Sequence, residues 1–246
     1  MSPNPERPPV RSGFGGQPHP GSPPVWPRHP RTDEPLTFLL QIDFAETWAA
    51  TDRRVSTLPT AGLLQLFMRN PTEMAGGGFD GADQAETAVR WYPADALPTD
   101  ALPTDDSAAP AGPSIRDERI AIDLEWEPVV TYADLVESGS FSEQECVEWL
   151  YAHAAHQLQG TPTPVQYDPR IGIPSEPTNE ATRLTRWRRA WFPEPETPNE
   201  DWELLLQLDR DPRVGLDLPG VLYLMVRTAD LSSGDLSQVW TDLQVD

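Results

Sequence analysis

Lysine is absent from this sequence, cysteine occurs once, and no long run of apolar residues interrupts its polar composition. All 18 basic residues are therefore arginine, and against 39 acidic residues they leave a formal net charge of -21. The single cysteine, Cys146, excludes an intramolecular disulfide and a thiolate metal cluster, and it indicates a reducing compartment. Cys146 falls on the apolar side of a predicted helix, which favours core packing over a nucleophilic role.

The shortness of every apolar run argues against a membrane span. Residues 220–226, the most apolar stretch, are far too few to cross a bilayer. Residues 1–30 contain no apolar segment of the kind that a secretion signal needs. We therefore expect a soluble cytoplasmic protein. The negative charge disfavours nucleic acids and anionic membranes as partners and is compatible with a basic protein partner.

Signatures of common enzymes are missing as well. The sequence has no Gly-x-Ser-x-Gly elbow, Walker loop or dinucleotide-binding fingerprint. His19 and His29 lie in proline-rich sequence and are expected to be solvated, while His153 and His156 lack the further ligands of a zinc site. His156 is expected to fix the turn before Gly160 instead. We therefore predict no catalytic residue, no metal site and no cofactor.

What the sequence does contain is a phrase that occurs twice. Residues 38–43 read Phe-Leu-Leu-Gln-Ile-Asp and residues 204–209 read Leu-Leu-Leu-Gln-Leu-Asp, and a second matching phrase follows each copy, at residues 58–67 and 216–225. Two copies of a β-rich unit, too far apart for a solenoid repeat, predict an internal duplication folded as one pseudo-symmetric body.

Side chains alternate across a strand, so each copy should have a core side and an opposite side. In the first copy, Leu39, Gln41 and Asp43 are expected on the side away from the core. The expected core positions of the two copies are Phe38, Leu40, Ile42, Leu204, Leu206 and Leu208.

The remaining pattern mixes strand and helix signals and predicts an α+β fold with a few helices. Further strands are expected at residues 62–67, 88–92 and 120–126, the first of them paired antiparallel with residues 38–43. One helix is expected to begin at a capping box at Ser142 and to be closed by Gly160. A second helix is expected from about Thr178 to Pro193, followed near the C-terminus by a helical turn and a short strand or helix. The second helix carries Arg183, Arg186, Arg188 and Arg189, which either neutralise nearby carboxylates or bind an acidic ligand.

Composition divides the chain into a leader and one domain. Residues 1–13 are expected to form a flexible, proline-rich leader. Residues 14–246 are expected to form a single domain with halves at about 14–130 and about 131–246. A tandem Ala-Leu-Pro-Thr-Asp repeat marks residues 95–113 as a low-complexity surface loop. Trp26 should anchor the preceding loop to the folded body.

Several short phrases also occur in a characteristic order. The first half contains Phe14-Gly15-Gly16-Gln17-Pro18, Trp26-Pro27 and residues 35–42, and the second half contains His156, Gly160-Thr161-Pro162, Gln166, residues 202–209, Gly220, Leu222-Tyr223 and a closing series at residues 230–244. In this order they resemble the YwqG-like family of bacterial proteins. The resemblance implies a mixed α and β fold of two similar halves, with no established enzymatic activity. The tandem pentapeptide is a departure from the pattern of that family.

The most site-like positions are Gln41 and Asp43 and their copies Gln207 and Asp209. If a pseudo-twofold axis relates the halves, two amides and two carboxylates could surround one cleft and bind a cation or a polar ligand. The alternative is that these side chains satisfy backbone groups of neighbouring loops.

These observations favour a non-catalytic binding protein over other classes. A basic protein partner fits the negative charge, so we expect the binding protein to have an immunity-type or regulatory role. A small-molecule or metal-ion binding module that uses the Gln and Asp pairs is the alternative, and an unrecognised hydrolase is a third class.

Overall fold

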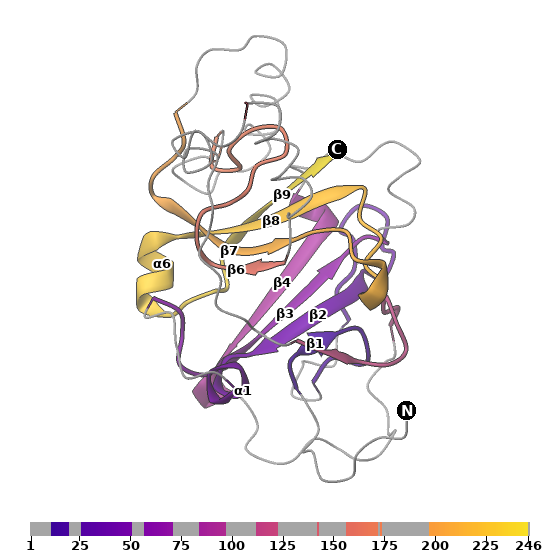
Figure 1. Cartoon of the computed structure of the whole chain (residues 1–246). Coiled ribbons are helices and arrows are strands. Elements are labelled where there is room, and N and C mark those ends of the chain that lie inside the picture. Colours follow the sequence, from indigo (N-terminus) through magenta and orange to yellow (C-terminus); the bar gives the residue numbers. More distant parts are fainter. Residues whose placement is uncertain are drawn as a thin grey trace.

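Two antiparallel sheets and two short α-helices make up the part of the chain that the structure describes. The structure is a computed structural model, and it describes residues 11–19, 26–50, 57–70, 84–96, 112–122, 142, 156–171, 173 and 197–245. The strands of the second sheet cross over those of the first (Figure 1). The described part is therefore mostly β, and no helix within it has the length and apolar character needed to cross a membrane.

The first sheet has five strands in the order β4-β3-β2-β1-β5, and each neighbouring pair is antiparallel. Its strands are β1 (Gly13–Phe14), β2 (Thr37–Asp43), β3 (Gly62–Met68), β4 (Thr87–Pro93) and β5 (Ile120–Ala121). The strands expected at residues 38–43, 62–67 and 88–92 are confirmed, as is the antiparallel pairing of the first two. β5 covers the start of the strand expected at 120–126, of which residues 123–126 lie outside the described residues.

The second sheet has four antiparallel strands in the order β6-β7-β8-β9. They are β6 (Gln157–Leu158), β7 (Trp202–Leu208), β8 (Gly220–Arg227) and β9 (Val239–Val245). The helix expected to run to Gly160 is wrong at its C-terminal end, because Leu158 pairs with Leu206 as part of β6. Cys146, the second expected helix and its four arginines lie outside the described residues.

Each of the two α-helices follows a long strand directly. Helix α1 (Phe44–Ala49) continues from β2, and helix α6 (Thr228–Ser233) continues from β8 and ends at Gly234, whose φ is 74°. A left-handed residue at this point suits glycine, which carries no Cβ to clash. Three single-turn 3-10 helices complete the described elements: η1 (Gln84–Glu86), η2 (Ala94–Ala96) and η3 (Pro212–Val214).

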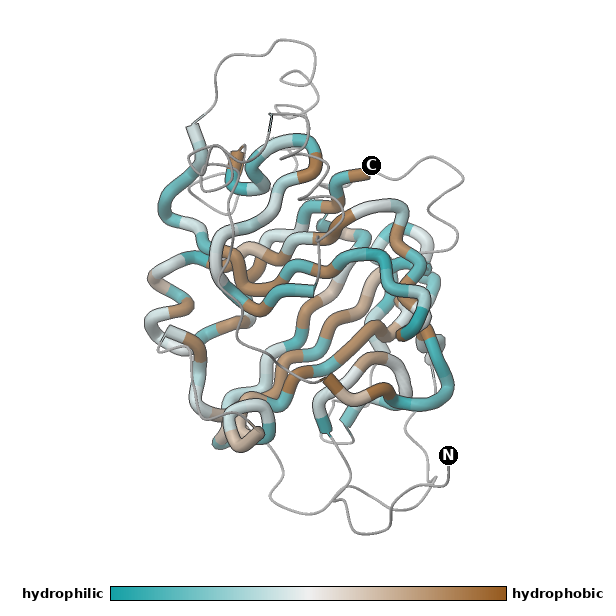
Figure 2. The backbone as a smooth tube through the Cα atoms, viewed as in Figure 1, coloured by the Kyte–Doolittle hydropathy of each residue, from teal (hydrophilic) through white to brown (hydrophobic). Residues whose placement is uncertain are grey.

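One apolar core lies between the two sheets. It includes Leu40 and Ile42 of β2 together with Leu206 and Leu208 of β7, and Figure 2 shows apolar stretches running along the strands of both sheets. All six core positions expected from the two phrases are buried, with exposed fractions of 4% or less. The two sheets therefore share the apolar contact that stabilises each of them.

A β-bulge changes which face some of these side chains occupy. The register shifts between Phe38 and Leu40 in β2, and it shifts between Leu204 and Leu206 in β7. An extra residue at a bulge breaks the simple alternation of a strand. Leu39 consequently joins the central core, while Phe38 packs in an outer cluster. The expectation that Phe38 shares a face with Leu40, and Leu39 the opposite one, is therefore wrong.

Trp26 anchors its loop to the outer face of the first sheet, as expected. Its Nε1 donates a hydrogen bond to the Leu36 carbonyl at 2.6 Å, and its ring meets that of Phe67 edge-on at 5.4 Å. A Cβ at Gly112 would overlap the Trp26 ring, so glycine is required where this second segment passes.

The outer edge of β9 is occupied at one residue by a side-chain amide. Gln84 Nε2 donates to the Thr241 carbonyl at 2.7 Å, and the Thr241 N–H donates to Gln84 Oε1 at 2.8 Å. The hydroxyls of Thr87 and Thr241 also meet at 2.8 Å. These bonds tie the segment before β4 in the first sheet to the edge of the second.

We expect Leu40→Ala and Leu206→Ala each to lower the free energy of unfolding by about 2–5 kcal/mol, because each leaves a cavity in the shared core. Val245→Ala is the control, since Val245 is 44% exposed and its truncation should cost less than about 0.5 kcal/mol. Urea unfolding followed by tryptophan fluorescence measures all three. If either core variant behaved like the control, the shared core would be refuted.

Candidate functional site

Gln41 is fully buried, and it binds the backbone of the segment that covers its face of the first sheet. Its Oε1 accepts the His19 N–H at 2.8 Å, and its Nε2 donates to the Arg11 carbonyl at 2.6 Å. Gln65, directly across on β3, donates to the same Oε1 at 3.2 Å. The amide of Gln41 thus holds residues 11–19 against the sheet.

Gln207 makes the corresponding bond in the second sheet. Its Oε1 accepts the Thr163 N–H at 2.9 Å, and the side chain is buried. In both sheets the bound N–H belongs to the residue after a proline, Pro18 in the first case and Pro162 in the second.

The two covering loops have the same backbone course. Gly15 and Gly16 have φ values of 65° and 69°, and Gln159 and Gly160 have φ values of 59° and 101°. The Gly15 N–H donates to the carbonyl of the bulged Leu39 at 2.8 Å, and the Gln159 N–H donates to that of Leu205 at 3.0 Å. In each sheet, therefore, a backbone N–H of the covering loop donates to the carbonyl of the bulged leucine.

Asp43 and Asp209 also bind backbone groups near the ends of their strands. Asp43 caps helix α1 by accepting the Ala45 and Glu46 N–H groups at 3.0 and 3.2 Å, and Arg11 lies 3.3 Å from its other oxygen. Asp209 Oδ1 accepts the Arg210 N–H at 2.6 Å.

The structure brings each Gln and Asp pair together with its own loop and not with the other pair. Gln41 lies between Leu40 and Ile42, which face the shared core, so its side chain points to the opposite, outer face of the first sheet. By the same alternation Gln207 points to the outer face of the second sheet. The two amides therefore lie on opposite sides of the core, and ligand binding by these four residues stays a prediction.

His156 lies where the first and second sheets meet, with its ring 4.9 Å from that of Phe14. Its Nδ1 accepts the Asp209 N–H at 3.3 Å, so in the neutral ring Nε2 carries the proton, 3.5 Å from Asp211 Oδ2. His156 thus braces the end of β7 instead of the turn before Gly160. Both ring nitrogens of His156 therefore face protein groups.

Burial and hydrogen bonding shift the pKa values of this pair. Burial lowers the pKa of His156, although the carboxylates of Asp211 and Asp209 oppose the shift. Hydrogen bonds from the Arg213 side chain lower the pKa of Asp211 to about 2. The native pair is therefore a neutral imidazole beside an ionised carboxylate.

His19 and His29 are each 2% exposed, so the expectation of solvated loop histidines is wrong. Their loops pack against the first sheet, and proline-rich composition does not reveal such packing. His29 lies between Thr32 Oγ1, 3.2 Å from its Nδ1, and Glu86 Oε1, 3.7 Å from its Nε2. The order Thr32, His29 and Glu86 resembles the nucleophile, base and acid of a catalytic triad. However, the Thr32 N–H already points at Nδ1 at 3.2 Å and the Thr32 hydroxyl donates to Glu34 at 3.0 Å, which is the pattern of a local turn.

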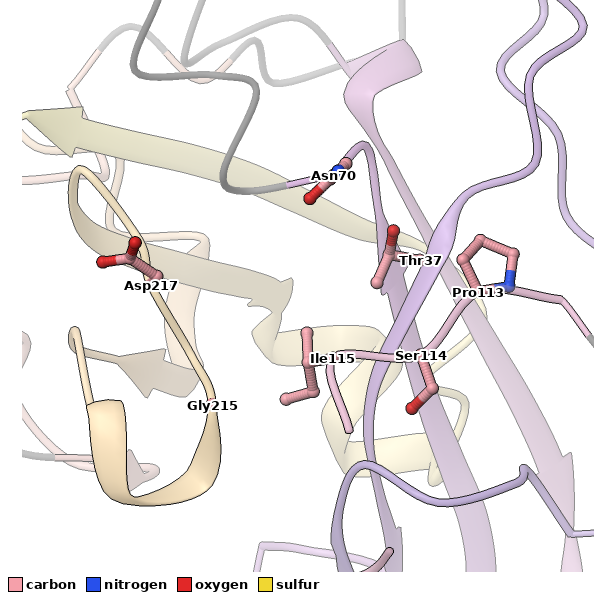
Figure 3. A pocket seen from close by; sticks show the side chains of 7 residues that line it. All are labelled: Thr37, Asn70, Pro113, Ser114, Ile115, Gly215 and Asp217. Carbon is pink, nitrogen blue, oxygen red and sulfur yellow. The ribbon is translucent and has the colours of Figure 1, made fainter. Parts of the chain in front are cut away.

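A pocket of about 270 Å³ lies where the connection between β7 and β8 meets the ends of β2 and β3 (Figure 3). Four of its lining residues are polar, namely Thr37, Asn70, Ser114 and Asp217. In Figure 3 the Asp217 carboxylate and the Ser114 hydroxyl point away from the other labelled side chains. Figure 3 shows Asp217 and Gly215 on one side and Thr37 and Ser114 on the other. The lining residues are Thr37, Asn70, Pro113, Ser114, Ile115, Gly215 and Asp217.

Backbone bonds fix both walls of this pocket. One wall, which contains Pro113 and Ile115, is bonded to the backbone of Phe38 in β2. The Phe38 N–H donates to the Pro113 carbonyl at 2.8 Å, and the Phe38 carbonyl accepts the Ile115 N–H at 3.1 Å. The other wall is closed by two bonds between Asp211 and Leu216, at 2.8 and 3.0 Å.

Arg116 joins the two walls. Its guanidinium donates to the Arg213 carbonyl at 2.6 Å. Its side chain also lies against Gly215, where an added Cβ would meet Arg116 Cγ at 2.7 Å and where φ is 78°. No sequence motif predicts this pocket, because its residues come from separate segments of the chain.

The fold and the site define a mostly β protein of two face-to-face sheets with a polar pocket where they meet. Residues 12–245 match the family model of DUF1963, a domain of unknown function, and the chain belongs to this family. The match includes every described strand from β1 to β9. No curated protein matches the chain. Within the described residues, no group of three or more His, Cys, Asp or Glu side chains is placed to hold a metal ion.

We expect Gln41→Ala to lower the free energy of unfolding by about 2 kcal/mol or more, because the His19 N–H and the Arg11 carbonyl would lose a buried partner. Gln17→Ala is the matched control, since Gln17 lies on the same covering segment with an exposed side chain. Urea unfolding measures both. Equal effects would show that the Gln41 amide does not hold the segment.

Lowering the pH should reveal the contribution of His156 to the free energy of unfolding. Its pKa in the folded chain is below the ordinary value of 6.5, so the unfolded chain binds the proton first as the pH falls, and stability is lost. Between about pH 7.5 and about pH 5, His156→Gln should therefore lose less free energy of unfolding than the wild type. Asp211, with a folded pKa of about 2, loses its contribution mainly at lower pH. The variant should still lose some free energy of unfolding over this range, because burial also lowers the pKa of His19. Equal losses in both proteins would contradict the assignment.

Proposed function

We propose that this chain is a non-catalytic binding protein whose partner is a basic protein, in an immunity-type or regulatory role. The observation that carries the proposal is the formal net charge of -21, which comes from 39 acidic residues against 18 arginines. Complementary charge accelerates encounter with a basic partner and discriminates against acidic ones.

The surroundings of the histidines support binding over catalysis. His156 Nδ1 accepts the Asp209 N–H and its Nε2 faces Asp211 at 3.5 Å, while His29 is enclosed by its own turn and Glu86. Both rings are therefore engaged with protein groups, which favours binding over hydrolysis at these two histidines.

For Gln41, Asp43, Gln207 and Asp209 we propose a supporting role, in which they fix the loops that frame the sheets. The alternative, a cation or small-molecule site at these side chains, requires breaking the backbone bonds that they make.

We further propose that the two sheets descend from an internal duplication and that the chain is a YwqG-like member of its family. Three paired observations support this: the bulges at Leu39 and Leu205, the left-handed residues of the covering loops, and the bonds from Gln41 and Gln207 to those loops.

We expect a fluorescent arginine homopeptide to bind the full chain and to lose at least about tenfold in affinity between about 50 mM and about 200 mM salt, because the attraction is electrostatic. A citrulline homopeptide of the same length is the neutral control and should not bind. Fluorescence anisotropy measures both. Equal binding of the two peptides, or no binding of the arginine peptide, would refute a basic partner.

A further inference from the structure

We propose that the outer edge of β4 binds an extended segment of the basic partner, which adds an antiparallel strand to the first sheet. β4 is an end strand of that sheet (Figure 1). An end strand offers backbone donors and acceptors that another chain can extend. This inference rests on the proposed function and names the way in which the partner docks.

The backbone groups of β4 that point to this edge follow from its pairing with β3. The Arg69 N–H donates to the Glu86 carbonyl at 2.7 Å, and these two residues continue the register of the two strands. Bonded pairs alternate along an antiparallel ladder, so the backbone groups of Val89 and Trp91 point away from β3. Within the described residues, no hydrogen bond reaches the backbone N–H or C=O of either residue. Both residues can therefore pair with an added strand.

The corresponding edge of the second sheet is protected. The strand orders β4-β3-β2-β1 and β9-β8-β7-β6 correspond, so β9 is the counterpart of β4. The side chain of Gln84 binds both backbone groups of Thr241 on β9. Val89 and Trp91 have no such side chain on their backbone groups within the described residues. Of these two edges, β4 is thus the one that can take a strand.

Both ends of the site on β4 are fixed. At one end the Thr87 hydroxyl meets that of Thr241 at 2.8 Å, which brings the second sheet against the edge. At the other end Pro93 has no N–H to offer, so a ladder cannot continue past it. The added strand therefore pairs with residues 88–92.

The side chains of β4 indicate what the added strand carries. Val89 and Trp91 are half-buried and pack against the rim of the shared core. Residues directly opposite each other in a sheet have their side chains on the same face, so apolar side chains should oppose these two. Arg90 lies between them on the outer face, with its guanidinium 5.4 Å from the centre of the Phe67 ring. This contact draws its charge toward β3 and away from the edge.

The charge near the edge favours a basic segment. Asp95 is exposed directly after the end of β4, and within the described residues it makes no ion pair. An antiparallel strand brings its N-terminal end to Pro93, so a basic residue there approaches Asp95. A second copy of this chain carries the same net charge of -21 and is repelled. The occupant is therefore a segment with alternating apolar residues and a basic N-terminal end.

The test uses a peptide built to this pattern, acetyl-Arg-Thr-Val-Thr-Val-Thr-amide, and the full chain. Titration followed by NMR should show saturable shifts of the Val89 and Trp91 amide signals. The control peptide has the same sequence with N-methyl groups on both valines, which keeps the side chains and the charge but removes two backbone donors. It should bind about tenfold more weakly or worse.

Two variants at one position test the same backbone contact from the protein side. Val89→Pro removes a donor that points away from β3, a place where an edge strand tolerates proline. Val89→Ala is the matched control, because it shortens the side chain and keeps the N–H. The proline variant should bind the peptide at least about fivefold more weakly than the alanine variant. Urea unfolding checks that both fold, and the N-methyl comparison on the wild type decides if the proline variant does not.

A second pair of variants tests the charge. Asp95→Asn should weaken binding of the peptide about two- to fivefold, as loss of an exposed ion pair does. Asp117→Asn makes the same change in net charge at an exposed position before β5, at the opposite end of the sheet. It should leave the affinity within about twofold.

The outcomes separate this inference from the proposed function. Equal binding of the methylated and unmethylated peptides would overturn the strand site, and the basic partner stands if the arginine homopeptide still binds. If the strand peptide binds as expected but citrulline replaces its arginine without effect and Asp95→Asn changes nothing, the basic partner is refuted at this edge. If neither peptide binds, both proposals fail. A dimer in sedimentation that Val89→Pro dissociates would assign the edge to a second copy and overturn its assignment to a partner.

Discussion

The hydrogen bonds between the buried Gln41 and Gln207 amides and the loop backbone are the constraint on which the two-sheet body depends. A sheet with one face in the shared core must still cover its other face, which here carries Phe38 in the first sheet and Leu204 in the second. The covering loops have few apolar side chains with which to bind, so a buried amide supplies the directional contact instead. Each covering loop is consequently held against the outer face of its sheet.

The pocket follows from the same arrangement of backbone. The bulge before Leu40 turns Phe38 outward, and the backbone groups of Phe38 then receive the segment of Pro113 and Ile115. Trp26 packs over that segment where Gly112 allows close approach. The walls are thus positioned by main-chain pairing, and their side chains are left to contact whatever enters.

The sequence supported the strands and the buried phrase residues because alternation is a local property of the chain. It did not reveal the bulges at Leu39 and Leu205. Each of these leucines stands between two other apolar residues, so an extra residue there does not interrupt the apolar run. It placed Leu158 in a helix because the apolar spacing there fits a helix, whereas pairing with Leu206 determines the strand. The pocket was not predictable, because Thr37, Asn70 and Asp217 meet only through tertiary structure.

The amide of Gln84 has a consequence for how copies of this protein meet one another. An edge strand exposes a row of backbone donors and acceptors that another chain can extend. At Thr241 both groups are already taken by a side chain that imitates a neighbouring strand for a single residue. A foreign strand aligning along β9 must displace that amide or leave a gap in its ladder. A single glutamine from the 3-10 helix before β4 thereby makes the edge a poor template for polymerisation.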